Sequence, residues 1–258
     1  MPHRSRFTPY QRADIILLRP REASGWSLIR YRRARPGWRG SGILLVQLLQ
    51  TLPALAAAIV LGFVVGITLH EAAHAYSAYL LGDDTAYRQG RVTLNPLKHL
   101  DPFGSIMLLL AGFGWGRPTP VAPARLKGGV LGPVSVALAG PASNLLILLV
   151  CAGLFRLPAF QQQGSALFWG VVGVAFVNAL LLVLNLIPIP PLDGAKVIFP
   201  FLPRALNGFV KFMNQYGPYI LLGLVALTFF TDTLSPLGFI LSLAGPLLQA
   251  LGIPSIFG

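Results

Sequence analysis

Two histidines and a glutamate stand together in an otherwise apolar run of this sequence, as His70-Glu71-Ala72-Ala73-His74. Histidines spaced i, i+4 on a helix project from one face, so both imidazoles can reach one metal ion. Glu71 follows the first histidine directly, where its carboxylate can take a proton from a metal-bound water. The alternative, three polar residues that hydrogen-bond inside a helix bundle, explains the spacing less well. The pattern therefore predicts a metal centre with a general base.

Two histidines do not complete a catalytic zinc site, which usually has three protein ligands and a water molecule. Asp193 is the leading candidate for the third ligand, because it follows an apolar segment that three prolines interrupt. A carboxylate at membrane depth costs about 2.5–3.5 kcal/mol on insertion scales, so it needs a cationic partner. The alternative roles of Asp193 are N-capping of the segment that begins at Gly194 and an ion pair with Lys196. Cys151 and His99 are the competing ligands.

The composition favours a membrane protein. Of 258 residues, 54% are hydrophobic and 11% are charged, and the charged fraction is less than half of the roughly 25% that is usual in soluble domains. We predict an all-α polytopic membrane protein of about six transmembrane helices, in the cell (inner or plasma) membrane. The apolar stretches on which this prediction depends are Ala54–Leu81, Gly129–Phe155, Ala166–Leu186, Ile220–Phe230 and Leu237–Leu251.

Three predicted helices must position these residues. A helix over 54–81 would be roughly 42 Å long, enough to cross a hydrocarbon core of about 30 Å. Its second half carries both histidines and Glu71, and Gly82 ends it. A second helix is predicted at about 130–155. A third, at about 166–187, ends at the proline-rich stretch that precedes Asp193.

The connection between the first two core helices, residues 83–128, is rich in Gly, Pro and basic residues. Residues 90–94 alternate like a short strand, and the apolar stretch 103–114 is too short to span a membrane. We therefore predict a small β or re-entrant element here. The proline-flanked stretch 116–121 must be extended, and we expect it to line a wet cavity and to pair with substrate as an added strand.

Residues 1–42 form a basic N-terminal extension, with ten arginines against Asp14 and Glu22. A nucleic-acid arm is one interpretation, and a segment that meets anionic lipid head groups is the one we favour, so no nucleic-acid partner is expected. We divide the remaining chain into a catalytic membrane core, 43–205, and C-terminal transmembrane helices, 206–258. Six basic residues within 88–127 place the active site near the cytoplasmic face, although a single crossing at 54–81 would then put the arginine arm outside.

Five motifs within residues 54–205 resemble the site-2 protease family of intramembrane zinc metalloproteases (peptidase family M50), in its short form without a PDZ domain. They are His70–His74, Leu94–Pro102, Phe113–Val121, Ala139–Asn144 and Asn185–Gly194. The resemblance implies one zinc ion per chain, held by His70, His74 and Asp193, with Glu71 as general base. It also implies a membrane-protein substrate that is cleaved in or near a transmembrane segment, often in a membrane-tethered regulator.

Asn144 and Asn185 are two further candidates for the catalytic machinery. Amides near the site could hydrogen-bond the substrate backbone or the developing oxyanion. Their alternative role is to hold membrane helices together. A non-proteolytic metal-binding protein or transporter is the alternative function, but it would spread polar groups over internal repeats, and none is evident. Intact Glu71 argues against a pseudoprotease.

Overall fold

The computed structural model describes residues 50–111, 114–228 and 236–254. Within these ranges the chain is mostly helical, as predicted, and contains no β-strand. The longer helices are α2 (Pro53–Leu80), α4 (Pro102–Ala111), α5 (Leu131–Phe155), α7 (Ala166–Asn185), α9 (Asn207–Thr228) and α10 (Pro236–Ala250). The short ones are α3 (Thr85–Arg88), α6 (Pro158–Gln161), α8 (Asp193–Ile198) and the 3₁₀ turns η1 (Pro96–Lys98), η2 (Pro123–Arg125), η3 (Phe199–Phe201) and η4 (Arg204–Leu206).

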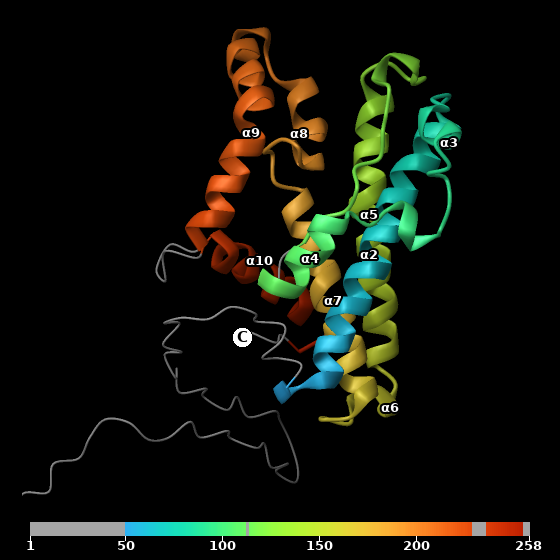
Figure 1. Cartoon of the computed structure of the whole chain (residues 1–258), viewed down its shortest axis with the longest axis vertical. Helices are drawn as coiled ribbons and strands as arrows, with labels where there is room; N and C mark the ends of the chain where they lie inside the picture. The colour runs from blue at the N-terminus through green and yellow to red at the C-terminus, as the bar shows by residue number, and fades with distance from the viewer. Residues whose placement is uncertain (1–49, 112–113, 229–235, 255–258) are drawn as a thin grey trace, which may run out of the picture. The chain divides into compact units, whose positions relative to one another are not determined.

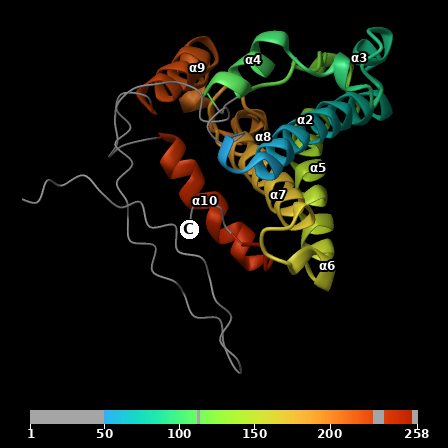
Figure 2. The ribbon, with the colours of Figure 1, turned by 60° about the horizontal axis from the view of Figure 1, so that its bottom comes forward.

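Helices α2, α5 and α7 form the centre of the fold, because each packs against the other two (Figure 1, Figure 2). Their observed bounds lie close to the predicted ranges. Helix α2 has Pro53 in its first turn, and it ends where Gly82 adopts a φ of 101°, a conformation that glycine adopts without steric cost. Helix α7 is capped by Ser165, whose hydroxyl oxygen accepts a hydrogen bond from the Phe168 N–H.

Glycines allow α2 and α7 to approach each other closely. A Cβ added at Gly62 would lie 2.9 Å from the Cα of Val174, and one added at Gly173 would lie 2.6 Å from the Cβ of Ala58. Small residues at helix crossings are the usual means of close packing between membrane helices. This approach brings the main chain of α2 within reach of polar side chains on α5 and α7.

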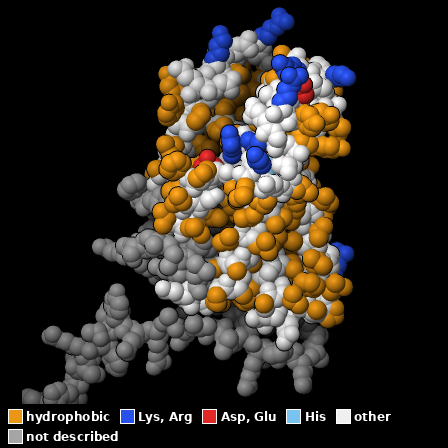
Figure 3. Space-filling model, turned by 45° about the vertical axis from the view of Figure 1, so that its right-hand side comes forward, with side chains coloured by type: hydrophobic (Ala, Val, Ile, Leu, Met, Phe, Trp, Pro, Cys, Tyr) orange, Lys and Arg blue, Asp and Glu red, His pale blue; other side chains and the backbone are white. Residues whose placement is uncertain are grey.

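The three central helices are each long and apolar enough to cross a membrane, which supports the predicted membrane protein. Apolar side chains on the outward face of α5 are exposed, as expected for a lipid-facing surface. They include Leu145, Leu146, Leu149 and Val150. In the space-filling view, hydrophobic side chains cover much of the described surface, while most Lys and Arg side chains lie toward its upper part (Figure 3).

The expected number of about six transmembrane helices is not confirmed. Among the described residues, only α2, α5 and α7 combine the length and the apolar character of a span. Helix α10 has 15 residues, roughly 22 Å at 1.5 Å per residue, which is shorter than a hydrocarbon core of about 30 Å. Helix α9 has 22 residues, but its first half carries Asn207, Lys211, Asn214 and Gln215.

The strand predicted at residues 90–94 does not form. Gly90 has a φ of 65°, and the Arg91 N–H bonds back to the carbonyl of Ala86 at the end of α3. No neighbouring strand is present in the described part of the connection, where only an isolated antiparallel bridge joins Leu100 to Gly116. The short apolar stretch that follows is the ten-residue helix α4. Alternation alone was therefore misleading here, because the turn at Gly90 sends the Arg91 side chain into the interior.

The proline-rich stretch after α7 turns the chain into α8, which packs against α5. Helix α10 packs against α7, and α9 contacts α10 and η4 (Figure 2). A Cβ added at Gly194 would lie 2.3 Å from the carbonyl oxygen of Leu186, so only glycine fits where the chain doubles back. This tight return fixes the position of the adjacent Asp193.

Candidate metal centre

Three buried side chains from two distant parts of the chain meet beside α5. His70 and His74 lie one turn apart on α2, and Asp193 is the first residue of α8, 119 positions after His74. Asp193 Oδ2 lies 3.1 Å from His70 Nε2 and 2.9 Å from His74 Nε2, and the two Nε2 atoms are 3.0 Å apart. Among the described residues, this is the group of His, Cys, Asp and Glu side chains close enough to share a metal ion.

The outer nitrogen of each imidazole is fixed by an acceptor on α5. His70 Nδ1 lies 2.7 Å from Asn144 Oδ1, and His74 Nδ1 lies 2.7 Å from the carbonyl oxygen of Val136. A carbonyl oxygen can only accept, so His74 Nδ1 must carry the proton. Bonds of this kind orient metal-binding histidines and select their tautomer. Both Nε2 atoms are thereby left with lone pairs that face Asp193.

The amide of Asn144 is oriented by a second amide, that of Asn178 on α7. Asn144 Nδ2 donates to Asn178 Oδ1 (2.9 Å) and to the Gly66 carbonyl (3.3 Å), so its Oδ1 is left to accept from His70. Asn178 Nδ2 in turn donates to the Val174 carbonyl. Both asparagines are fully buried. Asn178 is not among the candidates predicted from the sequence, although an amide inside the apolar run of α7 is a signal of a buried polar role.

Gly140 makes room for the two imidazoles. A Cβ at this position would lie 2.4 Å from His74 Nε2 and 2.6 Å from His70 Cε1. Gly140 belongs to the Ala139–Asn144 motif, in which the sequence drew attention only to Asn144. The motif therefore supplies both the space for the rings and the acceptor that orients one of them.

The donor set fits a zinc ion. Two nitrogen lone pairs and a carboxylate oxygen converge, and they would repel one another unless a cation lay between them. Donor atoms around a tetrahedral zinc are about 3.3 Å apart, given bonds of about 2.0–2.1 Å. The observed separations of 2.9–3.1 Å are within a few tenths of an ångström of that value.

Asp193 is both a candidate ligand and a member of an ion pair. Its Oδ1 accepts from Lys196 Nζ at 2.8 Å, while Oδ2 faces the imidazoles. The N-cap position of α8 is Leu192 and not Asp193. Asp193 can therefore be a metal ligand and the ion-pair partner of Lys196 at the same time, because the first role uses Oδ2 and the second uses Oδ1.

The Glu71 side chain faces Thr119, whereas the imidazoles of His70 and His74 face α5 and Asp193. Its Oε2 accepts hydrogen bonds from the N–H (2.8 Å) and the hydroxyl (2.7 Å) of Thr119, in the extended segment between Pro118 and Pro120. The side chain of Glu71 is buried, and the nearest cation is Arg91, whose Nη2 is 3.9 Å away. Thr119 lies in the stretch 116–121 that the prolines predict to be extended, but no sequence pattern predicts that Thr119 and Arg91 lie beside Glu71.

Three bacterial proteins are similar to this chain. "Putative zinc metalloprotease YwhC" of Bacillus subtilis is 44% identical over 168 residues, which cover 62% of this chain and 75% of YwhC. "Putative zinc metalloprotease Rip2" is 35% identical in Mycolicibacterium smegmatis (62% of each chain) and 34% identical in Mycobacterium tuberculosis (56% of this chain, 57% of Rip2). This chain belongs to their family of zinc metalloproteases, of the site-2 protease type. No protein-family model and no solved structure matches it.

The other polar residues considered from the sequence lie outside the trio of this metalloprotease. Asn185, at the end of α7, donates from Nδ2 to the Leu181 carbonyl one turn earlier. His99 donates from Nε2 to the Thr93 carbonyl, and burial lowers the pKa of its imidazole. Cys151 is buried in the apolar cluster of α5 and α7. Neither His99 nor Cys151 belongs to the metal-binding group, which leaves Asp193 as the third ligand that the geometry offers.

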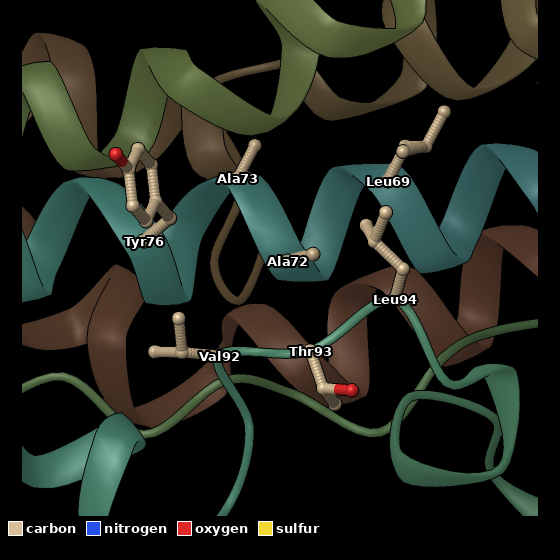
Figure 4. Close-up of a pocket in the computed structure, with 7 residues that line it drawn as sticks. All are labelled: Leu69, Ala72, Ala73, Tyr76, Val92, Thr93 and Leu94. Carbon is tan, nitrogen blue, oxygen red and sulfur yellow. The ribbon is translucent and has the colours of Figure 1, made fainter.

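An apolar pocket lies on another face of α2 (Figure 4). It has a volume of about 340 Å³ and is lined on the helix side by Leu69, Ala72, Ala73 and Tyr76. These positions are spaced i, i+3, i+4 and i+7, so they share one face, and neither histidine nor Glu71 belongs to it. The opposite wall is the segment 92–94, where a threonine supplies the polar group. This pocket therefore contributes no group to the metal centre.

Proposed function

We propose that this chain is an intramembrane zinc metalloendopeptidase that hydrolyses peptide bonds in or near transmembrane segments of other membrane proteins. The observation that carries the proposal is the setting of the metal centre. His70, His74 and Asp193 converge beside Glu71, and both histidines lie on a helix long and apolar enough to cross a membrane. A hydrolytic metal centre in that position acts on bonds that are themselves in the membrane.

In the proposed mechanism, His70, His74 and Asp193 hold one zinc ion per chain. A zinc ion bound there would polarise the substrate carbonyl and lower the pKa of a water molecule. Glu71 takes the proton of that water and delivers it to the leaving amine. Asn144 keeps the His70 tautomer that presents Nε2 inward, so it acts through His70. For Asn185, which is half-buried at the end of α7, we propose a hydrogen bond to the substrate backbone.

The proposed enzyme is a multi-pass protein of the cell membrane, with its active site near the cytoplasmic face. Three helices support several crossings, and the basic residues of the connection between α2 and α5 support that orientation by the positive-inside rule. We assign catalysis to residues 43–205 and further membrane-associated helices to 206–258. The basic extension 1–42 is proposed to meet anionic lipids. The substrate is a membrane-protein segment, and no nucleic acid takes part.

The test is cleavage of tagged single-span membrane segments by the full-length chain in membranes. The segments form a panel with Gly, Pro or Asn near one end, because a substrate helix must unwind before its peptide bond is accessible. We expect wild type to release a fragment and Glu71→Gln to reduce the rate by at least about a hundredfold, as for loss of a general base. Zinc content should be the same in both proteins. Equal cleavage by both proteins would overturn the proposed role of Glu71.

The alternative function is a non-proteolytic metal-binding membrane protein or transporter. Its distinguishing property is metal movement, so the same preparations are reconstituted in vesicles that contain a zinc-sensitive dye. The protease hypothesis predicts cleavage without flux. Flux that survives Glu71→Gln, in protein that cleaves none of the panel, would favour the transporter.

A further inference from the structure

The extended segment from Gly116 to Ala122, here called the strap, runs beside Glu71 of α2. The strap residue Thr119 donates its N–H and its hydroxyl to Glu71 Oε2, and the hydroxyl also lies 3.0 Å from the Glu71 carbonyl oxygen. No described residue donates a hydrogen bond to Oε1. Thr119 therefore fixes one carboxylate oxygen and leaves the other for a water molecule.

The strap is in turn held by the buried side chain of Arg91. Nη2 donates to the Arg117 carbonyl (2.6 Å) and lies 3.4 Å from Thr119 Oγ1, while Nη1 donates to the Pro118 carbonyl (3.2 Å). Only 3% of Arg91 is exposed, and the one acidic group near it is Glu71, with Oε2 3.9 Å away. A planar guanidinium can bind successive carbonyls in this way, whereas an ammonium cannot match the geometry.

Each end of the strap has its own anchor. The Arg117 N–H donates to the carbonyl of the buried His99 at 2.7 Å, and the Ala122 N–H donates to Asp83 Oδ2 at 2.6 Å. Between the anchors, the prolines on either side of Thr119 restrict the backbone. The strap is thus held on both edges by this chain's own groups, so the strand addition expected for this segment would require some of these bonds to open.

We propose that Thr119 is a positioning residue for Glu71 and that Arg91 positions Thr119 by holding the strap. This inference rests on the proposed function, in which Glu71 is the general base. Two hydrogen bonds from one residue fix the rotation of the carboxylate and keep Oε1 toward the reacting water. Effective catalysis by a general base requires such placement before reaction begins.

The test compares Thr119→Val with Thr119→Ser in full-length protein, using a segment that wild type cleaves. Valine has the shape of threonine but lacks the hydroxyl, and serine keeps it. We expect Thr119→Val to lower kcat by about tenfold to a hundredfold, the usual effect of losing a hydrogen bond to a charged group. KM should change little, because the valine variant removes a hydroxyl bond to Glu71 and leaves the backbone of the strap unchanged. Thr119→Ser should stay within about threefold of wild type, and zinc content should be unchanged in both variants.

Thr68→Val is the matched control, because the Thr68 hydroxyl is also buried but bonds only the Val64 carbonyl within α2. It should retain wild-type kcat. A kcat for Thr119→Val equal to that of the control would overturn the inference. A loss that Thr119→Ser does not restore would also overturn it, since the hydroxyl would not be the cause.

A second measurement needs no cleavage. Pro118 and Pro120 have no amide hydrogen, and the first residue of a peptide carries an amine, so a peptide covering residues 117–121 reports hydrogen exchange at Thr119 and Val121 alone. Glu71→Ala removes the acceptor of the Thr119 N–H, and we expect exchange of that amide to accelerate by at least about tenfold. Exchange at Ala122, which bonds to Asp83, should not change. Unchanged exchange at Thr119 would overturn the contact, whereas absence of cleavage by wild type with accelerated exchange would overturn only the proposed function.

Discussion

The candidate metal ligands His70 and His74 and the proposed base Glu71 are neighbours on α2, but they are supported by two different kinds of structure. His70 and His74 are oriented by groups on another long helix, Asn144 and the Val136 carbonyl of α5. Glu71 is oriented by the strap, an irregular segment without secondary structure of its own at Thr119. One turn of α2 therefore directs the two candidate ligands to a helix bundle and the proposed base to a loop.

Because His70 and His74 are supported by α5 and Glu71 is supported by the strap, zinc retention and catalysis should be separable. His70 is supported by a buried amide network in which Asn144 of α5 bonds Asn178 of α7 and the Gly66 carbonyl of α2. A change in this network should alter the position of the candidate ligand His70. The strap depends on a small number of hydrogen bonds to the side chains of Arg91 and Asp83 and to a carbonyl oxygen. Loss of the bonds from Arg91, which hold the strap next to Thr119, should move Glu71 without changing zinc affinity.

The variants Asp193→Asn and Glu71→Gln should show the largest difference between an effect on zinc binding and an effect on cleavage. The amide of Asn has no negative charge, so Asp193→Asn should weaken zinc binding by more than about a hundredfold, beyond the effect of altering a residue behind a ligand. Glu71→Gln should keep zinc and lose cleavage. Zinc content after dialysis against a chelator of known affinity measures the first effect. Retention of zinc by Asp193→Asn at wild-type affinity would show that the third ligand lies elsewhere.

The candidate metal ligands and the bounds of the helices that carry them could be predicted from the sequence. His70 and His74 have a spacing that only a helix converts into a common face, and ionisable groups in apolar runs are costly enough to require a partner. The same reasoning located Asp193 after the proline break. Helix bounds were predicted well because each helix is bordered by Pro, Gly or Ser, whose backbone preferences are strong.

The prolines predict the extended backbone of the strap, but its contacts with Glu71 and Arg91 could not be predicted from the sequence. Arg91 was assigned to a strand because residues 90–94 alternate, but its contact with the strap spans 26 residues, a separation that no local pattern encodes. For Asn144 the sequence leaves two roles open, a bond to substrate or oxyanion and a bond between helices, and the observed bonds of its amide to His70 and Asn178 agree with the second. Such roles depend on which helices are neighbours, and helix neighbours follow from tertiary packing.

A second prediction concerns the space that Gly140 leaves for the imidazole rings of His70 and His74. Gly140→Ala places a methyl group 2.4 Å from His74 Nε2, so the imidazoles must move apart and zinc affinity should fall by about a hundredfold. Gly153→Ala is the matched control on the same helix, because nothing lies within 4 Å of its added Cβ. The control should keep zinc and gain about 0.5–1 kcal/mol of stability. Zinc titration and Tm measure both variants, and equal zinc affinities would contradict the crowded geometry.

A third prediction concerns the acceptor behind His70. Asn144→Ala removes the partner of His70 Nδ1 and should weaken zinc binding by about 10–100-fold, the usual cost of losing a residue that orients a ligand. Ser143→Ala, one position away, removes a hydroxyl that bonds the Gly140 carbonyl within α5 and should have little effect. If Asn144 instead served only the oxyanion, its loss would lower kcat and leave zinc affinity intact.

A fourth prediction concerns the support of the strap. Arg91→Lys keeps the charge but cannot bind two carbonyls with one planar group, so kcat should fall by about threefold to tenfold while zinc affinity is unchanged. Arg88→Lys is the control from the same connection, since Arg88 is exposed and pairs with Asp84 at the surface. A parallel loss of zinc and activity in Arg91→Lys would mean that the two supports are not independent.

The smallest effect is expected at the far anchor of the strap. Burial alone would raise the pKa of the Asp83 carboxyl, but bonds from Thr85 and from the Ala122 N–H, with the charge of Arg125, lower the pKa of Asp83 below its ordinary value of 3.8. A carboxyl with a lowered folded-state pKa contributes stability that is present above the unfolded value and is lost as pH falls through the folded value. Asp83→Asn should therefore lower Tm by a few degrees at neutral pH, and the difference from wild type should vanish at acidic pH. Because the candidate ligands His70 and His74 are oriented by α5 and not by the strap, zinc affinity at neutral pH should not change. Among the strap amides, only that of Ala122 should exchange faster.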